Sequence, residues 1–122
     1  MRRGDIVTVA GGKDYAGKPR PAVVIQDDSF NSTGSITLCT FTTDDTEAPI
    51  LRLVVAPTDG NGLKVVSRLM VDKVTTVPKS KIGIIVGRLG DSDIVRLNQS
   101  LLVFLGLANS ARHPSTIASR ST

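Results

Sequence analysis

The chain contains very few of the residues that build metal sites, disulfides and histidine-based catalytic centres. It has one cysteine, Cys39, and one histidine, His113, among 122 residues. A single cysteine excludes a disulfide within the chain and fits a reducing compartment. With one histidine, far in sequence from the cysteine, neither a metal-cluster spacing nor a histidine-based hydrolytic triad is available. The sequence therefore predicts a cytoplasmic protein that needs no metal and no cofactor.

Aromatic residues and long apolar runs are also scarce. Tryptophan is absent and aromatic residues make up 3% of the chain, so few rings are available to stack on nucleic-acid bases. No stretch approaches the ~18 consecutive apolar residues that a membrane span requires. The opening residues Met1–Asp5 turn polar before an apolar signal core forms, so we expect neither a secretory signal nor a membrane partner.

Hydrophobic residues make up 40% of the chain, and many of them are valine, isoleucine or leucine. Among these, the β-branched residues suit the pleated surface of a sheet. A chain of 122 residues has the size of one domain and can hold one core without disulfides or metals. Its formal charge of +4 attracts polyanions such as RNA, although the same charge is common in proteins that bind none.

Short apolar runs alternate with turns rich in glycine, aspartate, asparagine and proline, and this pattern predicts strands. The predicted strands are residues 6–9, 21–26, 36–42, 51–55, 65–71, 73–77 and 82–86. The run at 21–26 is apolar without interruption, so we expect it to be buried on both faces. Cys39 lies within an apolar strand and is expected to be a small buried side chain.

The spacing of apolar residues along the sequence changes near the end of the chain. Between Asp93 and Leu107 the apolar residues recur at helical spacing and predict a helix of about four turns. Asp91, Ser92 or Asp93 is available to cap its first N–H groups. Several strands closed by one helix predict a mainly β fold, a small curved sheet or partial barrel. We place one domain at residues 1–108 and expect a loose polar tail at 109–122.

Two motifs that often mark catalytic sites are incomplete here. Residues 12–18 resemble the G-x-x-x-x-G-K part of a phosphate-binding loop, but Pro19 stands where the motif needs a hydroxyl, and a strand follows. The adjacent acids Asp27–Asp28 and Asp44–Asp45 fall in turns, where aspartate accepts hydrogen bonds from local backbone N–H groups. Neighbouring residues of a strand point to opposite faces, so such pairs do not converge on one ion.

Three polar positions remain as candidates. Arg20 lies between two prolines that fix the backbone on either side, so its guanidinium extends from a stiff base. Thr42–Thr43 end a predicted strand and place hydroxyls at the edge of the sheet. Ser67–Arg68 and Asp72–Lys73 place polar groups within an apolar stretch. By residue type alone, each of these is equally an ordinary exposed side chain.

An ordered set of segments resembles the MazF/PemK family of toxins from type II toxin-antitoxin systems. The similar segments are Arg3–Val7 (R-G-D-hydrophobic), Lys18–Gln26 (R-P-hydrophobic), Leu38–Thr43 (a strand that ends in threonine), Ser67–Lys73 and Leu89–Asp91. The similarity spans residues 3–107 in the same order and spacing. One segment departs from the family pattern. Many members carry an acid and a glutamine before the Arg-Pro step, whereas this chain has Asp14 farther from the arginine and no glutamine, so the role of Asp14 stays open.

The resemblance implies a small SH3-like (CcdB/PemK-like) β-barrel with a C-terminal helix, and a homodimer. It implies a sequence-specific endoribonuclease that cuts single-stranded RNA, chiefly mRNA, and that a cognate antitoxin silences. Such cleavage uses the 2′-OH of the RNA as the nucleophile and needs no metal. The RNA motif that is cut depends on loops at 11–18 and 43–48 and is not legible from the sequence.

The resemblance also implies roles for particular residues. Arg20 and Thr42 match the catalytic positions, and the RNA-binding set is Lys18, Thr43, Ser67, Arg68, Asp72 and Lys73. A guanidinium binds two phosphate oxygens at once, which suits Arg20 to stabilising the transition state. A guanidinium stays protonated and is therefore a poor general base, so the identity of the base is open.

Two other functions are compatible with such a barrel. A CcdB-like gyrase poison binds a protein target without cutting RNA, and uses a tryptophan at the end of its C-terminal helix. This chain has no tryptophan and continues beyond the predicted helix, which favours the ribonuclease. A catalytically inactive SH3-like binding module is the third alternative.

Overall fold

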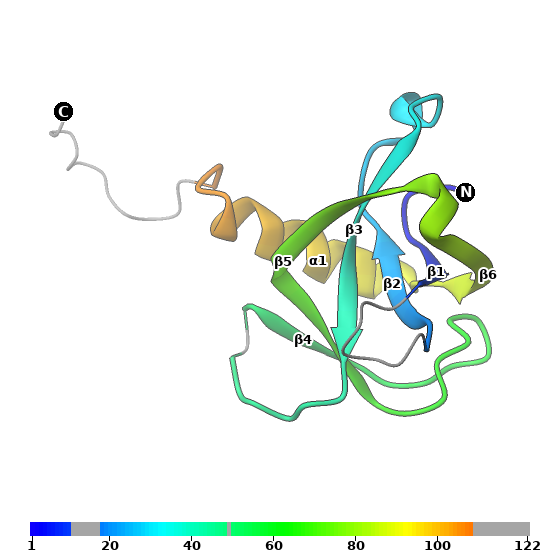
Figure 1. Cartoon of the computed structure of the whole chain (residues 1–122). Helices are drawn as coiled ribbons and strands as arrows, with labels where there is room; N and C mark the ends of the chain where they lie inside the picture. The colour runs from blue at the N-terminus through cyan, green and yellow to red at the C-terminus, as the bar shows by residue number, and fades with distance from the viewer. Residues whose placement is uncertain (11–17, 49, 109–122) are drawn as a thin grey trace, which may run out of the picture.

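The computed structural model describes residues 1–10, 18–48 and 50–108. These residues form one sheet, one α-helix and two short 3-10 turns (Figure 1). The elements are β1 (Asp5–Val9), β2 (Arg20–Val24), η2 (Asp28–Phe30), β3 (Ser35–Thr42), β4 (Arg52–Val55), β5 (Ser67–Pro78), η3 (Lys79–Lys81), β6 (Ile82–Arg88) and α1 (Asp91–Phe104). The prediction of a mainly β fold closed by a C-terminal helix is confirmed. The predicted tail at 109–122, Asp14 and His113 lie outside the described residues.

The sheet has six strands in the order β4-β5-β3-β2-β1-β6, and each neighbouring pair is antiparallel. The sheet is strongly curved (Figure 1), and β4 and β6 are its two end strands. Helix α1 lies across one side of it (Figure 1). The first strand, β1, lies inside the sheet because it pairs with both β2 and β6.

Strand β5 is a single element of 12 residues, although the sequence predicted two strands at 65–71 and 73–77. That prediction was wrong because the chain bends within the sheet without leaving it. Leu69 pairs with Phe41, but Val74 pairs with Cys39, so β5 carries extra residues between these two positions. Extra residues on one strand bend it and increase its twist. The first half of β5 pairs with β4 and the end of β3, and the second half pairs only with β3.

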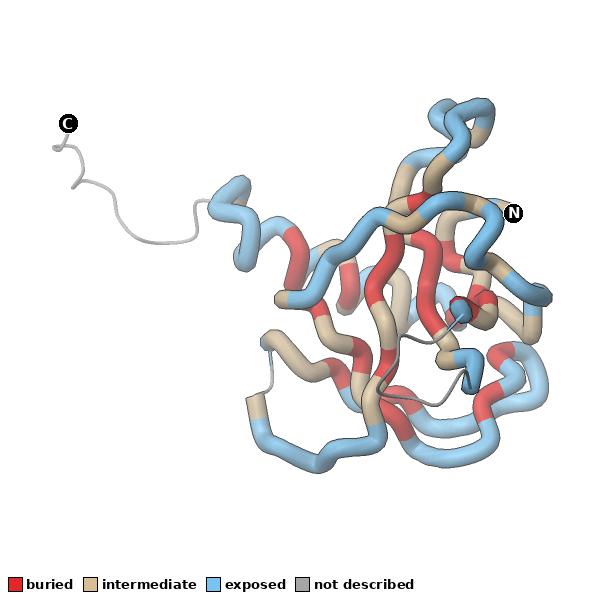
Figure 2. The backbone as a smooth tube through the Cα atoms, viewed as in Figure 1, coloured by how far each residue is buried: buried red, intermediate tan, exposed pale blue. Residues whose placement is uncertain are grey.

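The core consists of two apolar clusters, one on each side of the sheet. Leu97 and Leu101 of α1 join the larger cluster, which includes Val23 and Phe41 of the strands. The smaller cluster covers the other face. Its members are Val7, Val9, Ala22, Val24, Ile36 and Leu38. The alternating residues of β2 therefore contribute to both clusters, which confirms its predicted burial on both faces. Figure 2 shows this buried centre running through the strands.

The N-cap of helix α1 lies at least one residue before the positions predicted from the sequence. Gly90 is the N-cap and makes no capping hydrogen bond through a side chain, so the predicted caps at 91–93 were wrong. Asp91 and Asp93 instead lie in the first turn, where carboxylates interact favourably with the helix dipole. The helix ends at Phe104, and the φ of 74° at Gly106, two residues later, allows the chain to turn away. The N–H of Leu107 then donates to the carbonyl of Leu102 at 2.8 Å.

The turn before β5 packs against β6 with no space for a further side chain. Asn61 is buried, and its side-chain oxygen accepts hydrogen bonds from the N–H groups of Thr58 (2.9 Å) and Leu63 (3.0 Å). Gly62 has a φ of +70°, and a Cβ placed there would lie 2.2 Å from the carbonyl oxygen of Val86. Only glycine satisfies both conditions, so this turn fixes the loop against the edge of the sheet.

No helix among the described residues is long and apolar enough to cross a membrane.

Candidate active site

Arg20 and Thr42 lie side by side at one end of two paired strands. Arg20 begins β2 and Thr42 ends β3. The register pairs Ala22 with Thr40, and two residues farther along it Arg20 is level with Thr42. A guanidinium nitrogen of Arg20, Nη2, donates to the carbonyl oxygen of Phe41 at 3.2 Å. The fold therefore brings the two residues predicted to be catalytic together.

Arg68 of β5 extends this pair across a third strand. It is the direct partner of Thr42 in the β3–β5 register. Directly opposed residues share a face of the sheet, with Cβ atoms roughly 5 Å apart. Arg20, Thr42 and Arg68 thus form a row across three neighbouring strands, which we call the Arg–Thr–Arg row. It places one hydroxyl between two guanidinium-bearing side chains, on the face away from α1.

The hydroxyl of Thr42 is oriented by the segment that follows it. Its Oγ1 accepts a hydrogen bond from the backbone N–H of Asp44 at 3.1 Å. A hydroxyl that accepts through one lone pair still has its hydrogen to donate. Within the described part of the chain no group accepts from that hydrogen. Thr42 is half-buried, and this hydrogen bond orients its hydroxyl.

Two ion pairs lie beside the row. Arg68 Nη2 is 3.2 Å from Glu47 Oε2, and the Arg52 guanidinium binds the carboxylate of Asp72. Arg52 pairs with Met70 in the β4–β5 register, which places it on the same face as Arg68 and one step along the sheet. The sequence reasoning missed Arg52. The sequence did contain a signal for it, because Arg52 lies between two apolar residues of a predicted strand and so belongs to the face opposite to theirs.

The remaining predicted RNA-binding residues lie in different environments. Lys18, Thr43 and Lys73 are exposed. Ser67 is buried, and its Oγ donates to the carbonyl of Val65 at 3.0 Å. As the neighbour of Arg68 on a strand, Ser67 points to the opposite face and does not join the row.

Two of the turn aspartates, Asp27 and Asp44, accept local backbone hydrogen bonds as predicted, whereas Asp28 accepts from the distant backbone N–H of Arg3 at 2.6 Å. Asp27 accepts hydrogen bonds from the hydroxyl and backbone N–H of Ser29, and these bonds lower the pKa of its carboxyl. Asp44 accepts the same two bonds from Thr46, which lower its pKa, and the nearby charges of Arg52 and Arg68 lower it further. Asp44 therefore lies in the positive field of both arginines.

Burial decides the chemistry of the thiol in β3. Cys39 is fully buried, as expected, and burial raises the pKa of its thiol to about 12, with a smaller contribution from the charge of Asp72. Among the described residues there is no group of three or more His, Cys, Asp or Glu side chains that could hold a metal ion.

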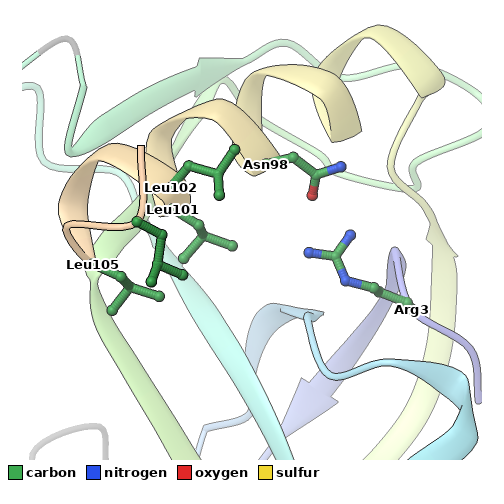
Figure 3. A pocket seen from close by; sticks show the side chains of 6 residues that line it. Arg3, Asn98, Leu101, Leu102 and Leu105 are labelled. Carbon is green, nitrogen blue, oxygen red and sulfur yellow. The ribbon is translucent and has the colours of Figure 1, made fainter. Parts of the chain in front are cut away.

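A pocket of ≈ 240 Å³ lies on the other side of the sheet, beside the end of α1 (Figure 3). It is lined by Arg3, Asn98, Leu101, Leu102, Leu105 and Leu107. Arg3 is anchored by its Nε, which donates to the carbonyl of Ile25 at 2.7 Å. Asn98 Oδ1 is buried without a hydrogen-bond partner in the described structure, and Figure 3 shows its amide facing the guanidinium of Arg3. This pocket is separate from the Arg–Thr–Arg row.

Residues 2–105 match the family described as PemK-like, MazF-like toxins of type II toxin-antitoxin systems. The chain belongs to this family. It is also 56% identical over 108 residues to a probable endoribonuclease MazF of Mycolicibacterium smegmatis, which covers 88% of this chain and 99% of the relative. The family match extends across all six strands and the helix of the described structure.

Solved structures of MazF proteins share the fold of this chain. An endoribonuclease in complex with its cognate antitoxin, from a mycobacterial species, has a TM-score of 0.74 at 20% identity and covers 88% of this chain and 97% of its own. A MazE–MazF structure from Deinococcus radiodurans has a TM-score of 0.70 at 17% identity and covers 88% and 98%. At these identities the likeness concerns the fold.

Proposed function

We propose that the chain is a type II toxin that acts as a sequence-specific endoribonuclease and cuts single-stranded RNA through the RNA's own 2′-OH, without a metal. Membership of the PemK/MazF family and the 56% identity to a probable endoribonuclease support the general activity. The observation that carries the mechanism is the Arg–Thr–Arg row, which gathers three phosphate-binding groups on one face.

The chemistry needs little from the protein beyond position and charge. The 2′-OH loses its proton to solvent as its oxygen attacks the adjacent phosphorus, and a doubly charged pentavalent phosphate forms. The bond from phosphorus to the 5′-oxygen then breaks, and the 5′-oxygen takes up a proton from solvent. The products are a 2′,3′-cyclic phosphate and a 5′-OH. Arg20 binds two phosphate oxygens and neutralises the charge that develops, while the Thr42 hydroxyl donates a hydrogen bond to the phosphate or the leaving oxygen. Because a guanidinium stays protonated, Arg20 stabilises charge and does not abstract the proton.

The other residues predicted to bind RNA divide into two groups. Lys18, Thr43 and Lys73 are exposed and contact the RNA backbone, as does Arg68 within the row. Ser67 and Asp72 act from within the protein. Ser67 fixes the start of β5 through its bond to a local carbonyl, and Asp72 holds the guanidinium of Arg52.

A homodimer and an acidic antitoxin are the proposed protein partners. The end of α1 exposes apolar side chains at Val103, Phe104 and Leu105, and large exposed apolar patches mark interfaces. A second copy of the chain covers this surface. An antitoxin with an acidic, disordered segment covers the Arg–Thr–Arg row, and its charge speeds the encounter with a protein of charge +4. The gyrase-poison alternative is not favoured, because the family that matches residues 2–105 is the MazF-like one.

The test is cleavage of a single-stranded RNA in excess EDTA, followed by identification of the new termini. We expect cleavage to continue in EDTA and to leave a cyclic phosphate and a 5′-OH. Replacing the 2′-OH at the cut site with hydrogen should stop cleavage but preserve binding. Cleavage that stops in EDTA, or that proceeds at a deoxynucleotide, would show that the proposed mechanism is wrong.

A further inference from the structure

Glu47 is bound to one of the two arginines of the row. Its carboxylate lies 3.2 Å from Arg68 Nη2, yet 81% of its side chain is exposed, against 16% for Arg68. The arginine is therefore fixed in the sheet, whereas the acid approaches it from the solvent side. A carboxylate in this position engages a guanidinium with the same geometry as a phosphate.

The segment that carries Glu47 is tethered at both ends. At its start, the N–H of Asp44 donates to the hydroxyl of Thr42. At its end, the carbonyl of Ala48 accepts hydrogen bonds from the N–H groups of Leu51 (2.9 Å) and Arg52 (2.7 Å). These tethers keep residues 44–47 beside the row. The lowered pKa of Asp44, to which the charges of Arg52 and Arg68 contribute, agrees with this placement.

The two acids that bind arginines on this face differ in how easily they can be displaced. Asp72 belongs to β5, and 25% of its side chain is exposed, so its bond to Arg52 is built into the sheet. Glu47 lies between strands, and exposed ion pairs of this kind contribute little to stability. A phosphate that binds Arg68 through two oxygens forms a stronger contact and replaces it. Of these two acids, Glu47 is the one that an arriving RNA displaces.

We infer that Glu47 occupies, in the free protein, the place on Arg68 that an RNA phosphate takes on binding. The carboxylate thereby sets how tightly the toxin holds RNA. This inference rests on the proposed ribonuclease function, and it assigns to Glu47 an affinity-determining role outside the predicted catalytic and RNA-binding residues. Removing the charge of Glu47 should tighten RNA binding, whereas removing the charge of Arg68 should weaken it.

The experiment measures binding of a labelled 2′-O-methyl copy of an RNA fragment that the protein cuts. We expect Glu47→Gln to bind about two- to five-fold more tightly at low salt, the range that an exposed ion pair supports. The dependence of affinity on salt should also steepen, by up to about 0.7 in the log–log slope, because the phosphate that binds Arg68 releases its cation and no displaced carboxylate takes one up. The melting temperature should not change, since the side chain is exposed.

Asp45→Asn is the matched control, because it removes the same charge from the same segment at an exposed residue whose side chain makes no hydrogen bond or ion pair with the described residues. It should change affinity much less than Glu47→Gln does. In an Arg68→Gln background, Glu47→Gln should have no further effect. Equal affinities for Glu47→Gln and the wild type, equal gains in the two acid variants, or a gain that persists without Arg68 would each overturn the inference. A wild-type protein that neither cuts nor binds RNA would instead refute the proposed function.

Discussion

At the scale of single residues, Arg20 and Thr42 form the part of the site on which the mechanism depends most. We expect Arg20→Ala and Thr42→Ala each to lower the rate of RNA cleavage on the order of 10²-fold or more, the effect of removing one preorganised donor to a transition state. A single-turnover assay on a labelled RNA measures the loss. Both side chains are at the end of strands and only half-buried, so the melting temperatures should hardly move.

Arg2→Ala serves as the control for these variants. It removes the same charge from an exposed arginine that precedes β1 and is not part of the row. Its cleavage rate should stay close to that of the wild type. Full activity in Arg20→Ala, or an equal loss in Arg2→Ala, would contradict the assignment of the row as the catalytic centre.

Cys39 provides a second prediction at this scale, because burial holds the pKa of its thiol at about 12. A raised pKa keeps the thiol protonated at every pH below that value, and only the thiolate is nucleophilic. We expect no alkylation of the native protein by iodoacetamide at pH 8, and full alkylation in guanidinium chloride. Mass spectrometry of the intact chain distinguishes the two. Rapid labelling of the native protein would mean that β3 opens readily or that the thiol is accessible.

At the scale of elements, the turn between β4 and β5 is the segment most constrained by its neighbours. Gly62→Ala should destabilise the protein by about 2 kcal/mol or more, because alanine disfavours a positive φ and its Cβ would meet the backbone of β6. Thermal unfolding followed by circular dichroism measures the change. Gly34→Ala is the control, since a Cβ there meets nothing within 4 Å. A wild-type melting temperature for Gly62→Ala would show that the turn adapts.

Most of the strands could be predicted from the sequence because their apolar runs are short and bounded by turn residues. The ends of β1 and β3 agree with the predicted limits to within one residue. The continuity of β5 could not be predicted, since Asp72 and Lys73 interrupt its apolar pattern where the strand bends. From the sequence alone, polar residues at a bend within one strand cannot be distinguished from a turn that separates two strands. The helix cap was missed because Gly90 needs no side chain to start α1.

The candidate site was predictable only in part, for a related reason. Arg20 and Thr42 came from the family resemblance, and the strand register explains why they meet. Arg52 and Asp72 are 20 residues apart on strands whose pairing the sequence does not reveal, so their ion pair could not be inferred. The contact between Glu47 and Arg68 likewise depends on how a segment outside the strands lies over the sheet.

At the scale of the whole molecule, the prediction concerns self-association and the domain boundary. A protein that ends at Ala108 should sediment as a dimer at micromolar concentration and should still cut RNA, because residues 109–122 are polar and unpatterned. Phe104→Glu should shift the equilibrium toward the monomer, since it places a charge in the exposed apolar end of α1.

Val95→Glu is the matched control, because Val95 is also an exposed apolar residue of α1 but lies near the start of the helix. It should remain dimeric. A monomeric wild-type protein with full activity would contradict the dimer, and an inactive protein ending at Ala108 would show that the domain extends into the C-terminal segment.

The place of β1 in the sheet has a consequence for how the protein folds during its synthesis. Although β1 is the first strand of the chain, its second neighbour is β6, which begins only at Ile82. During synthesis on the ribosome, one edge of β1 therefore cannot form its hydrogen bonds until β6 has been made, and α1 is made after β6. The strands that carry the Arg–Thr–Arg row, β2, β3 and β5, are all made before β6 and α1 complete the fold. The toxin therefore reaches its complete fold only after β6 and α1 have been synthesised.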